Sequence, residues 1–312
     1  MMWARILPYD KTAIAEAARL IGEGRPVAMP TETVYGLAAD AMRGEAVAAI
    51  YAAKGRPSFN PLIVHVLDLE AADAIADLTP AARRLAEQFW PGPLTLVAPL
   101  RPGAGIAALA TAGLATIALR APAHPAMRDL LRATGKPLAA PSANASGTIS
   151  PTRAAHVLRS LGCSIELIVD AGPTSVGLES TIVAAQSEGL RILRPGPITA
   201  EQLSRISGLP VVATAASGAI EAPGQLAQHY APSKPVRLEA TEAREGEWLI
   251  GFGAVAGDMS LSPAGDLAEA AARLFDLLHE ADAGPAPRIA IAPVPDEGLG
   301  AAINDRLRRA AA

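Results

Sequence analysis

The sequence has one cysteine, few aromatic residues and no long apolar run. A single cysteine, Cys163, excludes an internal disulfide and any metal centre built from several cysteines. We expect this thiol to be buried and inert, because free cysteines usually pack as small apolar side chains. No apolar stretch approaches the roughly 18 residues that a membrane-spanning helix needs, and Met1 to Lys11 lacks the apolar core of a signal peptide. These absences favour a protein of the reducing cytoplasm without membrane contact.

Three widespread catalytic motifs are absent as well. The sequence has no Gly-x-x-x-x-Gly-Lys-Ser/Thr phosphate loop, no Gly-x-Ser-x-Gly nucleophile turn and no His-Glu-x-x-His zinc motif. A P-loop ATPase, a hydrolase with that turn and a zinc protease are therefore disfavoured. Any phosphate-binding site must be built in another way.

The residues that are present indicate a two-domain α/β protein. Half of the 312 residues are hydrophobic, and single domains usually hold about 100–200 residues. Residues 236–312 hold 7 basic and 13 acidic residues, a net charge of −6, whereas residues 1–235 hold 20 and 18, a net charge of +2. Neither part has the charge of a dedicated nucleic-acid binder, so an anionic ligand needs locally placed cations.

Helical and strand patterns alternate along residues 1–208. Helices are predicted over Thr12–Ile21, Glu45–Ala53, Pro80–Trp90, His124–Thr134, Ser150–Leu161 and Ala200–Ser207, and strands over Val27–Met29, Leu62–Leu67, Leu94–Pro99, Ala115–Arg120, Glu166–Asp170, Ser180–Ala184 and Leu190–Arg194. This alternation predicts an α/β sheet flanked by helices. The consecutive strands after Ile165 predict hairpins, so the sheet should be mixed.

We predict three parts in the chain. Residues 1–208 form the first domain, and residues 209–235 form a linker rich in Ala, Gly and Pro that contains the pair His229–Tyr230. Residues 236–312 form a smaller α/β unit, with strands over Trp248–Ile250 and Arg288–Ile291 and helices over Leu267–Glu280 and Leu299–Arg309.

One polar segment organises the first domain. Pro30-Thr-Glu-Thr-Val-Tyr-Gly36 follows a short apolar strand, and its hydroxyl and carboxyl groups compete with regular structure by bonding the backbone. We interpret it as a polar loop at a strand end. Taken alone, it is equally an ordinary turn.

Cations recur where predicted elements end. Lys54 and Arg56 flank a glycine, Arg120 ends a strand, and Arg194 precedes Pro195-Gly196. Ligands of open α/β sheets bind outside strand ends, so these side chains can converge on a phosphate chain. Taken singly, each is more readily explained as a solvated surface group.

A hydroxyl-rich loop repeats this pattern. Ser142, Asn144 and Ser146 lead to Ser150-Pro151, which we predict to be the N-cap and first residue of a helix. Helix N-termini bind anions through their free N–H groups and the helix dipole. The loop is therefore a second candidate phosphate contact, although ordinary capping explains it equally.

In this order the segments resemble one family, the YrdC-like threonylcarbamoyl-AMP synthases in their longer two-domain form. The resemblance is carried by Pro30–Leu37, Lys54–Pro57, Trp90–Thr95, Ile117–Pro122, Ala140–Asn144, Ser146–Gly147 with Ser150–Thr152, Gly177–Ile182 and Arg194–Gly196, and by His229–Pro235 in the linker. It implies a YrdC-like twisted mixed sheet for residues 1–208 and a small Rossmann-like α/β domain for residues 236–312.

The resemblance implies an enzyme, a nucleotidyltransferase. L-threonine, bicarbonate or CO2, and ATP with Mg²⁺ would give threonylcarbamoyl-AMP and pyrophosphate. The product would pass to a tRNA threonylcarbamoyl transferase complex that modifies the adenosine beside the anticodon. Such chemistry depends mainly on positioning and charge stabilisation. The sequence holds no obvious covalent nucleophile, and we predict no protein metal site.

The resemblance also assigns residues to the site. The threonine pocket would consist of Thr33, His65, Arg120, Ala140 through its backbone, and Ser180. The nucleotide pocket would consist of Lys54, Arg56, Asn60, Thr116, Ser142, Asn144, Ser150, Arg194 and Tyr230. The catalytic cations would be Lys54, Arg56 and Arg120. Because Tyr230 lies in the linker, we expect residues 221–232 to fold over the nucleotide as a lid that excludes water.

Two other interpretations stay open. The first domain could bind RNA directly, which the acidity and the scarcity of aromatic residues disfavour. It could instead use carbamoyl phosphate, as hydrogenase maturation proteins with a similar domain do, but the zinc-finger cysteines and acylphosphatase-like segment of those proteins are missing. The sequence leaves open the oligomeric state, the role of the C-terminal domain, the choice between bicarbonate and CO2, and the acceptor of the product.

Overall fold

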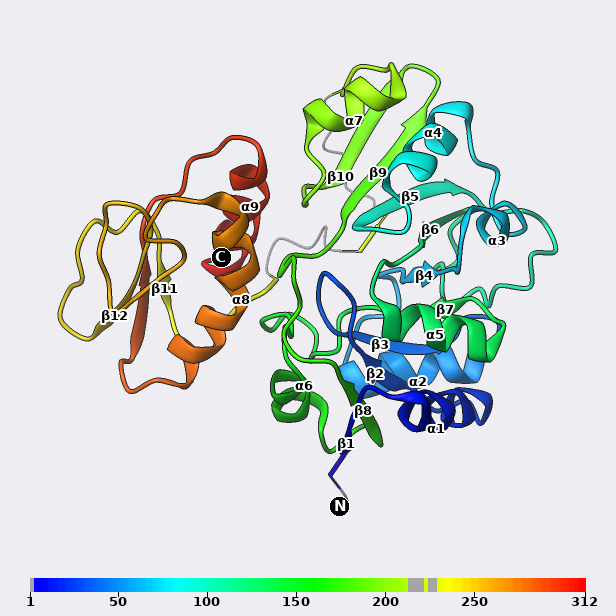
Figure 1. The fold of residues 1–312 in the computed structure, drawn as a ribbon, viewed down its shortest axis with the longest axis horizontal. Coiled ribbons are helices and arrows are strands. Elements are labelled where there is room, and N and C mark those ends of the chain that lie inside the picture. Colours follow the sequence, from blue (N-terminus) through cyan, green and yellow to red (C-terminus); the bar gives the residue numbers. More distant parts are fainter. Residues whose placement is uncertain (1–2, 213–221, 224–228) are drawn as a thin grey trace.

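The structure, a computed structural model, describes residues 3–212, 222–223 and 229–312 and consists of two α/β units (Figure 1). The larger unit extends from the blue N-terminal strand to the yellow-green helix α7 (Ala200–Ser207). The smaller unit, coloured yellow to red, lies beside it. Its helices α8 (Leu267–Ala283) and α9 (Leu299–Ala310) lie between its own sheet and the larger unit.

A ten-stranded mixed sheet is the centre of the larger unit. In spatial order its strands are β1 (Arg5–Pro8), β8 (Leu167–Asp170), β2 (Val27–Met29), β3 (Gly36–Asp40), β7 (Leu138–Ala139), β4 (Ile63–His65), β6 (Thr116–Arg120), β5 (Leu94–Pro99), β9 (Thr181–Gln186) and β10 (Gly189–Arg194). Parallel pairs such as β4–β6 occur beside antiparallel pairs such as β3–β7. The predicted mixed sheet is confirmed.

Helices flank this sheet, and local capping determines several of their ends. They are α1 (Lys11–Gly22), α2 (Gly44–Lys54), α3 (Leu69–Asp73), α4 (Pro80–Phe89), α5 (Pro125–Thr134), α6 (Ala154–Leu161) and α7. Asp10 caps α1 by accepting a hydrogen bond from the amide of Ala13 at 2.7 Å. Gly135 ends α5 in the left-handed conformation, with φ 61°.

The smaller unit has a parallel four-stranded sheet. Its strands lie in the order β11 (Val236–Arg237), β14 (Arg288–Ile291), β12 (Glu247–Gly251) and β13 (Met259–Ser260). Parallel pairing requires long connections, which α8 and the loops of this unit supply. The arrangement is the α/β type that a Rossmann-like unit requires.

Several short elements were not predicted, and one predicted pairing is wrong. The strands β1, β3, β7 and β13 and the helix α3 hold two to five residues each, too few to reveal a period. The expected hairpin between the strands near residues 166 and 180 does not form, because β8 pairs in parallel with β1 and β2. The next two strands, β9 and β10, do form a hairpin.

The predicted helix start at Ser150-Pro151 is also wrong. Helix α6 begins at Ala154. The carbonyl oxygen of Pro151 accepts from the amide of Tyr35 at 2.8 Å and so is not available to a first helical turn. The hydroxyl of Ser150 donates to Glu179 instead of capping a helix. Tertiary contacts therefore delay the helix by three residues.

Cys163 is exposed, which contradicts the expectation of a buried thiol. It lies in the turn that follows α6, and Gly162 donates its amide to Leu158 at the end of that helix. Turns run over the surface, because buried backbone needs partners. The exposure of Cys163 is therefore determined by its place in a surface turn and not by the apolar character of its side chain.

An apolar cluster joins the two units. Val34, Ile149 and Leu178 of the larger unit and Tyr230 of the linker pack in one core with residues of α8 and α9, among them Phe275. Burial of these faces removes apolar surface of both units from water. The smaller unit is therefore held to the larger one by a shared core as well as by the chain.

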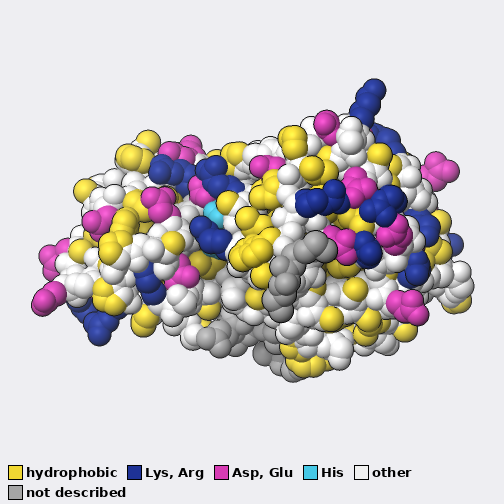
Figure 2. Space-filling model, turned by 90° about the horizontal axis from the view of Figure 1, so that it is seen from below, with side chains coloured by type: hydrophobic (Ala, Val, Ile, Leu, Met, Phe, Trp, Pro, Cys, Tyr) yellow, Lys and Arg dark blue, Asp and Glu magenta, His cyan; other side chains and the backbone are white. Residues whose placement is uncertain are grey.

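The surface carries charges of both signs. On the face shown in Figure 2, Lys and Arg side chains are interspersed with Asp and Glu. Arg25 and Glu166 form one exposed ion pair, at 2.6 Å. In the described ranges, no helix has the length and apolarity required to cross a membrane.

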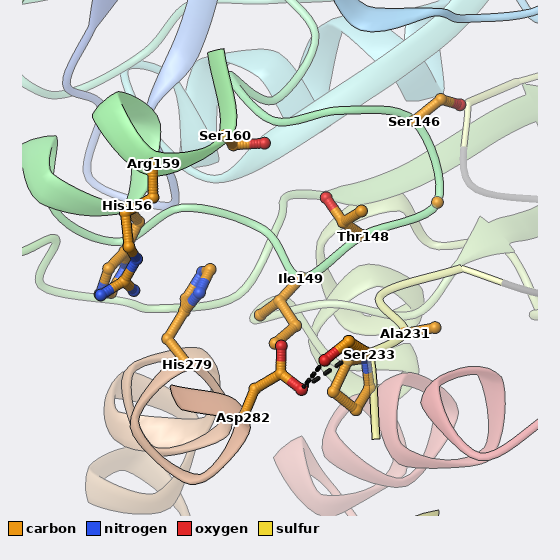
Figure 3. A pocket seen from close by; sticks show the side chains of 12 residues that line it. Ser146, Thr148, Ile149, His156, Arg159, Ser160, Ala231, Ser233, His279 and Asp282 are labelled. Carbon is orange, nitrogen blue, oxygen red and sulfur yellow. Dashed lines mark hydrogen bonds between the residues drawn. The ribbon is translucent and has the colours of Figure 1, made fainter. Parts of the chain in front are cut away.

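Two histidines meet across the interface, beside a cavity of about 510 Å³. His156 of α6 and His279 of α8 face each other in Figure 3, and their ring centroids lie 3.9 Å apart. His279 Nε2–H donates to the carbonyl oxygen of Ser150 at 3.1 Å. Burial lowers the pKa of His156 to about 3 and that of His279 to about 4, so both rings are neutral at pH 7.

We predict that acid weakens this interface. Folding lowers the pKa of His279 from its usual value of 6.5 to about 4. The folded state is therefore favoured fully above pH 6.5, and this contribution to the free energy of unfolding is lost as the pH falls toward 4. His279→Gln keeps a donor for Ser150 but does not titrate, so its unfolding temperature should fall less between these pH values than that of the wild type. Thermal unfolding as a function of pH tests this. Equal losses in both proteins would contradict it.

Candidate active site

Seven of the fourteen predicted site residues line a small cavity of about 40 Å³ at the carboxyl ends of β4 and β6. It is lined by Thr33, Val34, Arg56, Ile63, His65, Arg120, Ala140, Pro141, Ser142, Glu179, Arg194, Pro223 and His229. This volume is far below the roughly 300–1,000 Å³ of pockets that hold small-molecule ligands. The larger cavity between the units is lined by none of the residues predicted for the threonine or nucleotide pocket, although Ser146 of the hydroxyl-rich loop borders it. We therefore take the small cavity as the candidate site, in a closed state.

Arg120 is the central cation of the cavity. It ends β6, and its buried guanidinium donates to Thr33 Oγ1 at 2.9 Å, to Glu32 Oε1 at 2.8 Å and to the carbonyl oxygen of Gly92 at 3.2 Å. An arginine has five N–H groups, so two remain for a ligand. The planar fork of the guanidinium suits a carboxylate.

The carboxylate beside Arg120 stays ionised. Burial alone would raise the pKa of Glu32, but the charge and the hydrogen bond of Arg120 outweigh burial and hold this pKa below its usual value. Glu32 therefore neutralises part of the charge of Arg120 and fixes the plane of its guanidinium.

His65 lies beside Arg120, its partner in the parallel register of β4 and β6. Burial, and then the nearby charge of Arg120, lowers the pKa of His65 to about 3, so the ring is neutral at pH 7. Its buried Nδ1 makes no hydrogen bond within the described part of the chain. An unpaired buried nitrogen is costly, and a polar ligand in the cavity would satisfy it.

Ser180 and Ala140 complete the predicted threonine pocket in different ways. The amide of Ala140 donates to the carbonyl of Ile63 at 2.9 Å, and this bond fixes the backbone of Ala140 where it lines the cavity. Ser180 Oγ lies 2.7 Å from Thr95 Oγ1 and accepts from Arg194 Nη2 at 3.1 Å. Ser180 is thus held in place next to the cavity, although it does not line it.

The turn after Arg194 needs a glycine. A Cβ at Gly196 would lie 2.4 Å from the backbone nitrogen of Thr181, closer than any real contact. The absence of a side chain lets this turn lie against the start of β9, which brings Arg194 within 3.0 Å of the carbonyl oxygen of Ser180. Arg194 is buried, and burial lowers its pKa.

Arg56 and Asn60 form a second polar group. Arg56 follows Gly55, which ends α2 with φ 58°, and donates to the carbonyl oxygens of Asn60 at 3.2 Å and Pro61 at 2.9 Å. Burial lowers the pKa of Arg56 to about 10, which leaves it charged at pH 7. Both side-chain polar atoms of Asn60 are buried without a partner among the described residues. They are free to bind a ligand.

Lys54 supports a loop rather than lining the cavity. Its ammonium donates to the carbonyl oxygens of Ser142, at 2.6 Å, and Asn144. Burial lowers the pKa of Lys54 well below its usual value. The Asn144 side chain closes the same loop by donating to the carbonyl of Thr148 at 2.8 Å. Ser142 lines the cavity from this loop.

Thr116 lies at the opposite end of β6 from Arg120. Ile63, the first residue of β4, pairs with Ala118, so Thr116 lies at the edge of the sheet where the amino ends of β4 and β6 are found. Four residues of strand separate this edge from Arg120, a distance of about 13 Å. Thr116 does not line the cavity in its closed state.

Ser150 and Tyr230 are buried behind the cavity. Ser150 is held by Glu179, and the ring of Tyr230 lies 5.5 Å from that of Phe275. Tyr230 has φ 65°, a left-handed conformation that costs a bulky residue roughly 1–2 kcal/mol. Packing of its fully buried ring maintains this conformation.

The linker closes one side of the cavity. Pro223 and His229 both line it, and burial lowers the pKa of His229 to about 3. Residues 221 and 224–228 of the predicted lid lie outside the described residues. Its described part therefore contacts the same space as Arg56 and Arg120.

Two polar lining residues were not assigned to either pocket by the sequence analysis. Glu179 lines the cavity. Burial alone would raise the pKa of Glu179, but the charges of Arg306 and Arg194 outweigh burial and hold this pKa below its usual value. His229 was noticed only as the neighbour of Tyr230. Glu179 lies in Gly177–Ile182, one of the segments that carry the resemblance, but its partner Arg306 lies 127 residues away. Local patterns do not reveal such a pair.

Cations outnumber carboxylates around the cavity. Arg56, Arg120 and Arg194 face Glu32 and Glu179 in a space from which water is largely excluded. Charge interactions are stronger in such surroundings than in water. The site can therefore bind anionic groups and stabilise charge that develops on them.

Two family models match this chain, and together they cover nearly all of it. The Sua5, YciO and YrdC family, described as telomere recombination, matches residues 19–196, and the threonylcarbamoyl-AMP synthase C-terminal domain matches residues 198–312. The threonylcarbamoyl-AMP synthase of Bacillus subtilis is 41% identical over 98% of this chain and 94% of its own. That of Pyrococcus abyssi is 38% identical over 96% of this chain and 94% of its own.

A solved structure has the same fold over the whole length. The crystal structure of Pyrococcus abyssi Sua5 complexed with L-threonine matches with a TM-score of 0.88 and 35% identity, and covers 100% of this chain and 97% of that chain. Both units and their arrangement are therefore shared. The chain belongs to the threonylcarbamoyl-AMP synthase family, in its two-domain form.

Proposed function

We propose that this chain condenses L-threonine, bicarbonate or CO2, and ATP to threonylcarbamoyl-AMP and pyrophosphate. The observation that carries the proposal is the pairing of His65 with Arg120, beside Thr33, in a closed cavity with a surplus of arginines. The relatives from Bacillus subtilis and Pyrococcus abyssi bear the name of this activity.

The threonine half-site is formed by the carboxyl ends of β4 and β6. The two remaining N–H groups of Arg120 bind the substrate carboxylate, and Thr33 orients both. His65 Nδ1 and the carbonyl oxygen of Ala140 bind the polar groups near the amine. Ser180 supports this side from behind.

The nucleotide half-site extends along the sheet toward its other edge. Arg56 and Arg194 bind phosphate oxygens, Ser142 binds from the loop that Lys54 and Asn144 hold, and Asn60 and Thr116 contact the nucleoside. The separation of about 13 Å between the two strand edges suits a nucleotide and an amino acid placed end to end. Ser150 and Tyr230 back this half-site.

The chemistry is two bond-forming steps. The amine nitrogen of threonine bonds to the carbon of CO2 with release of a proton, or to the carbon of bicarbonate with loss of water, and either route forms a carbamate. A carbamate oxygen then attacks the α-phosphorus, and the bond to the bridging oxygen breaks as pyrophosphate leaves. Arg56 and Arg194 stabilise the charge on the phosphates as it moves to the leaving group. The protein contributes position and charge, without a covalent intermediate.

Magnesium enters with ATP in this proposal. In the described ranges no group of three His, Cys, Asp or Glu side chains could hold a metal. Mg²⁺ is commonly bound through substrate phosphates and water. It would neutralise part of the phosphate charge, and the arginines would bind the rest.

We propose that residues 1–208 form the catalytic domain, residues 209–235 the linker and lid, and residues 236–312 the C-terminal domain. Substrates do not fit the 40 Å³ cavity, so Pro223 and His229 must move away before ATP enters. The substrates and the tRNA transferase complex that takes the product point to the cytoplasm.

The RNA-binding alternative gains little from the structure. Lys54, Arg56, Arg120 and Arg194 are all buried, whereas phosphate contacts to RNA need exposed cations. The charges visible in Figure 2 alternate in sign and form no basic stripe on that face. Direct binding of tRNA is therefore not part of the proposal.

The two half-sites should separate in kinetics. Arg120→Lys keeps the charge but loses the fork, so the KM for L-threonine should rise about tenfold with little change in the KM for ATP. Asn60→Ala should do the reverse. Threonine-dependent release of pyrophosphate, with L-serine as a control substrate, measures both. Equal effects of each variant on both substrates would contradict the division.

The lid should protect the product from water. His229→Ala opens one side of the cavity, so pyrophosphate release should exceed the threonylcarbamoyl-AMP recovered by a larger ratio than in the wild type. Ser233→Ala, in the same linker but outside the cavity, is the matched control. Product recovery that is the same in the two variants would argue against a lid.

A further inference from the structure

The last helix carries a buried arginine into the space between the units. The side chain of Arg306 on α9 is completely buried. A charge in that position is costly unless it is well paired. The role of Arg306 therefore depends on its contacts, and these lie mostly in the larger unit and the linker.

Arg306 contacts the larger unit and the linker at the same time. Its Nε donates to Glu179 Oε2 at 2.9 Å, and its guanidinium carbon lies 5.1 Å from the centre of the Tyr230 ring, within the range of a cation–π contact. Nη1 donates to its neighbour Asp305 at 2.7 Å. One side chain of the C-terminal domain thus holds a carboxylate that lines the cavity.

Glu179 links Arg306 to the nucleotide half-site. Its other oxygen accepts from the hydroxyl of Ser150, and the next residue, Ser180, is bonded to Arg194. Arg194 also attracts Glu179 electrostatically. Without Arg306, the carboxylate of Glu179 would pair with Arg194 and so compete with the phosphates of ATP for that cation.

We propose that Arg306 is a positioning residue of the nucleotide half-site: by pairing with Glu179 and seating Tyr230, it leaves Arg194 free to bind the phosphates of ATP. The inference rests on the proposed function and gives the C-terminal domain a role in it. Arg306 itself touches no substrate, because it does not line the cavity.

The proposal has a pH signature. The charged and titratable groups that face Glu179 are Arg306, Arg194, His229 and Tyr230, with Asp305 behind Arg306. Among them Arg306 contributes most to holding the pKa of Glu179 down, against burial, which raises it. When Arg306 is removed, this pKa rises, and the carboxylate becomes protonated as the pH is lowered. Protonation ends the competition for Arg194.

Equilibrium binding of ATP to the full chain tests the proposal. Arg306→Gln should raise the Kd for ATP about tenfold at pH 8, because a buried charged partner is lost. Its ATP affinity should improve as the pH falls from about 8 to about 5. The double variant Arg306→Gln, Glu179→Gln removes both charges and should regain much of the affinity without that pH dependence. Arg306→Lys keeps a charge and should lie between wild type and Arg306→Gln.

The controls separate positioning from folding and from the proposed reaction. Arg308→Gln, on the same helix but exposed, should bind ATP like the wild type. If Arg306→Gln binds ATP like Arg308→Gln, or weakly at every pH and no better in the double variant, Arg306 is only structural and the proposal is wrong. A wild type that binds ATP in this pattern but makes no threonylcarbamoyl-AMP would overturn the proposed function and leave the role of Arg306 in place.

Discussion

The parallel pairing of β4 with β6 is the constraint on which the site depends. It puts His65 next to Arg120 at the carboxyl ends of both strands, while Thr116 begins β6 at the opposite end. A shift by one residue would turn these side chains to the other face. The strands are short, and their neighbours β7 and β5 pair with them in antiparallel fashion, so the register is fixed from both sides.

Buried charge makes this arrangement demanding. Arg120, Arg56 and Arg194 are each less than a tenth exposed, and most of their partners are backbone carbonyl oxygens. Carbonyl partners satisfy N–H groups without cancelling the charge, so the cavity stays positive. The carboxylates of Glu32 and Glu179 neutralise only part of it. An anionic substrate offsets the remaining cost of burial.

Closure of the cavity connects this chemistry with the second unit. The apolar core that includes Tyr230 and Phe275 holds the linker against both units. His229, the residue before Tyr230, lines the cavity, and its amide donates to the carbonyl oxygen of Arg309 on α9 at 3.3 Å. The C-terminal unit is thus positioned to influence the lid, although none of its own residues line the cavity.

The sequence was sufficient for the fold class and for most residues that surround the cavity. Arg56 and Arg120 lie within motifs that carry the resemblance, whereas His65 lies in a plain apolar strand and was assigned by the resemblance alone. Ser150 was misread because its partner Glu179 lies 29 residues away, and a hydroxyl before a proline looks like a helix cap from local pattern alone. Arg306 sits in an ordinary amphipathic helix. Arg306 is buried because the two units pack against each other, and the periodicity of apolar residues within α9 does not reveal that contact.

Exchange of labelled pyrophosphate into ATP tests the central claim most directly. If the carbamate of threonine attacks the α-phosphorus in this cavity, exchange requires L-threonine and bicarbonate together, and stops when either is omitted. Exchange with threonine alone would mean that the amino acid carboxylate is adenylated instead. Exchange without any amino acid would mean that the two half-sites do not form one reaction centre.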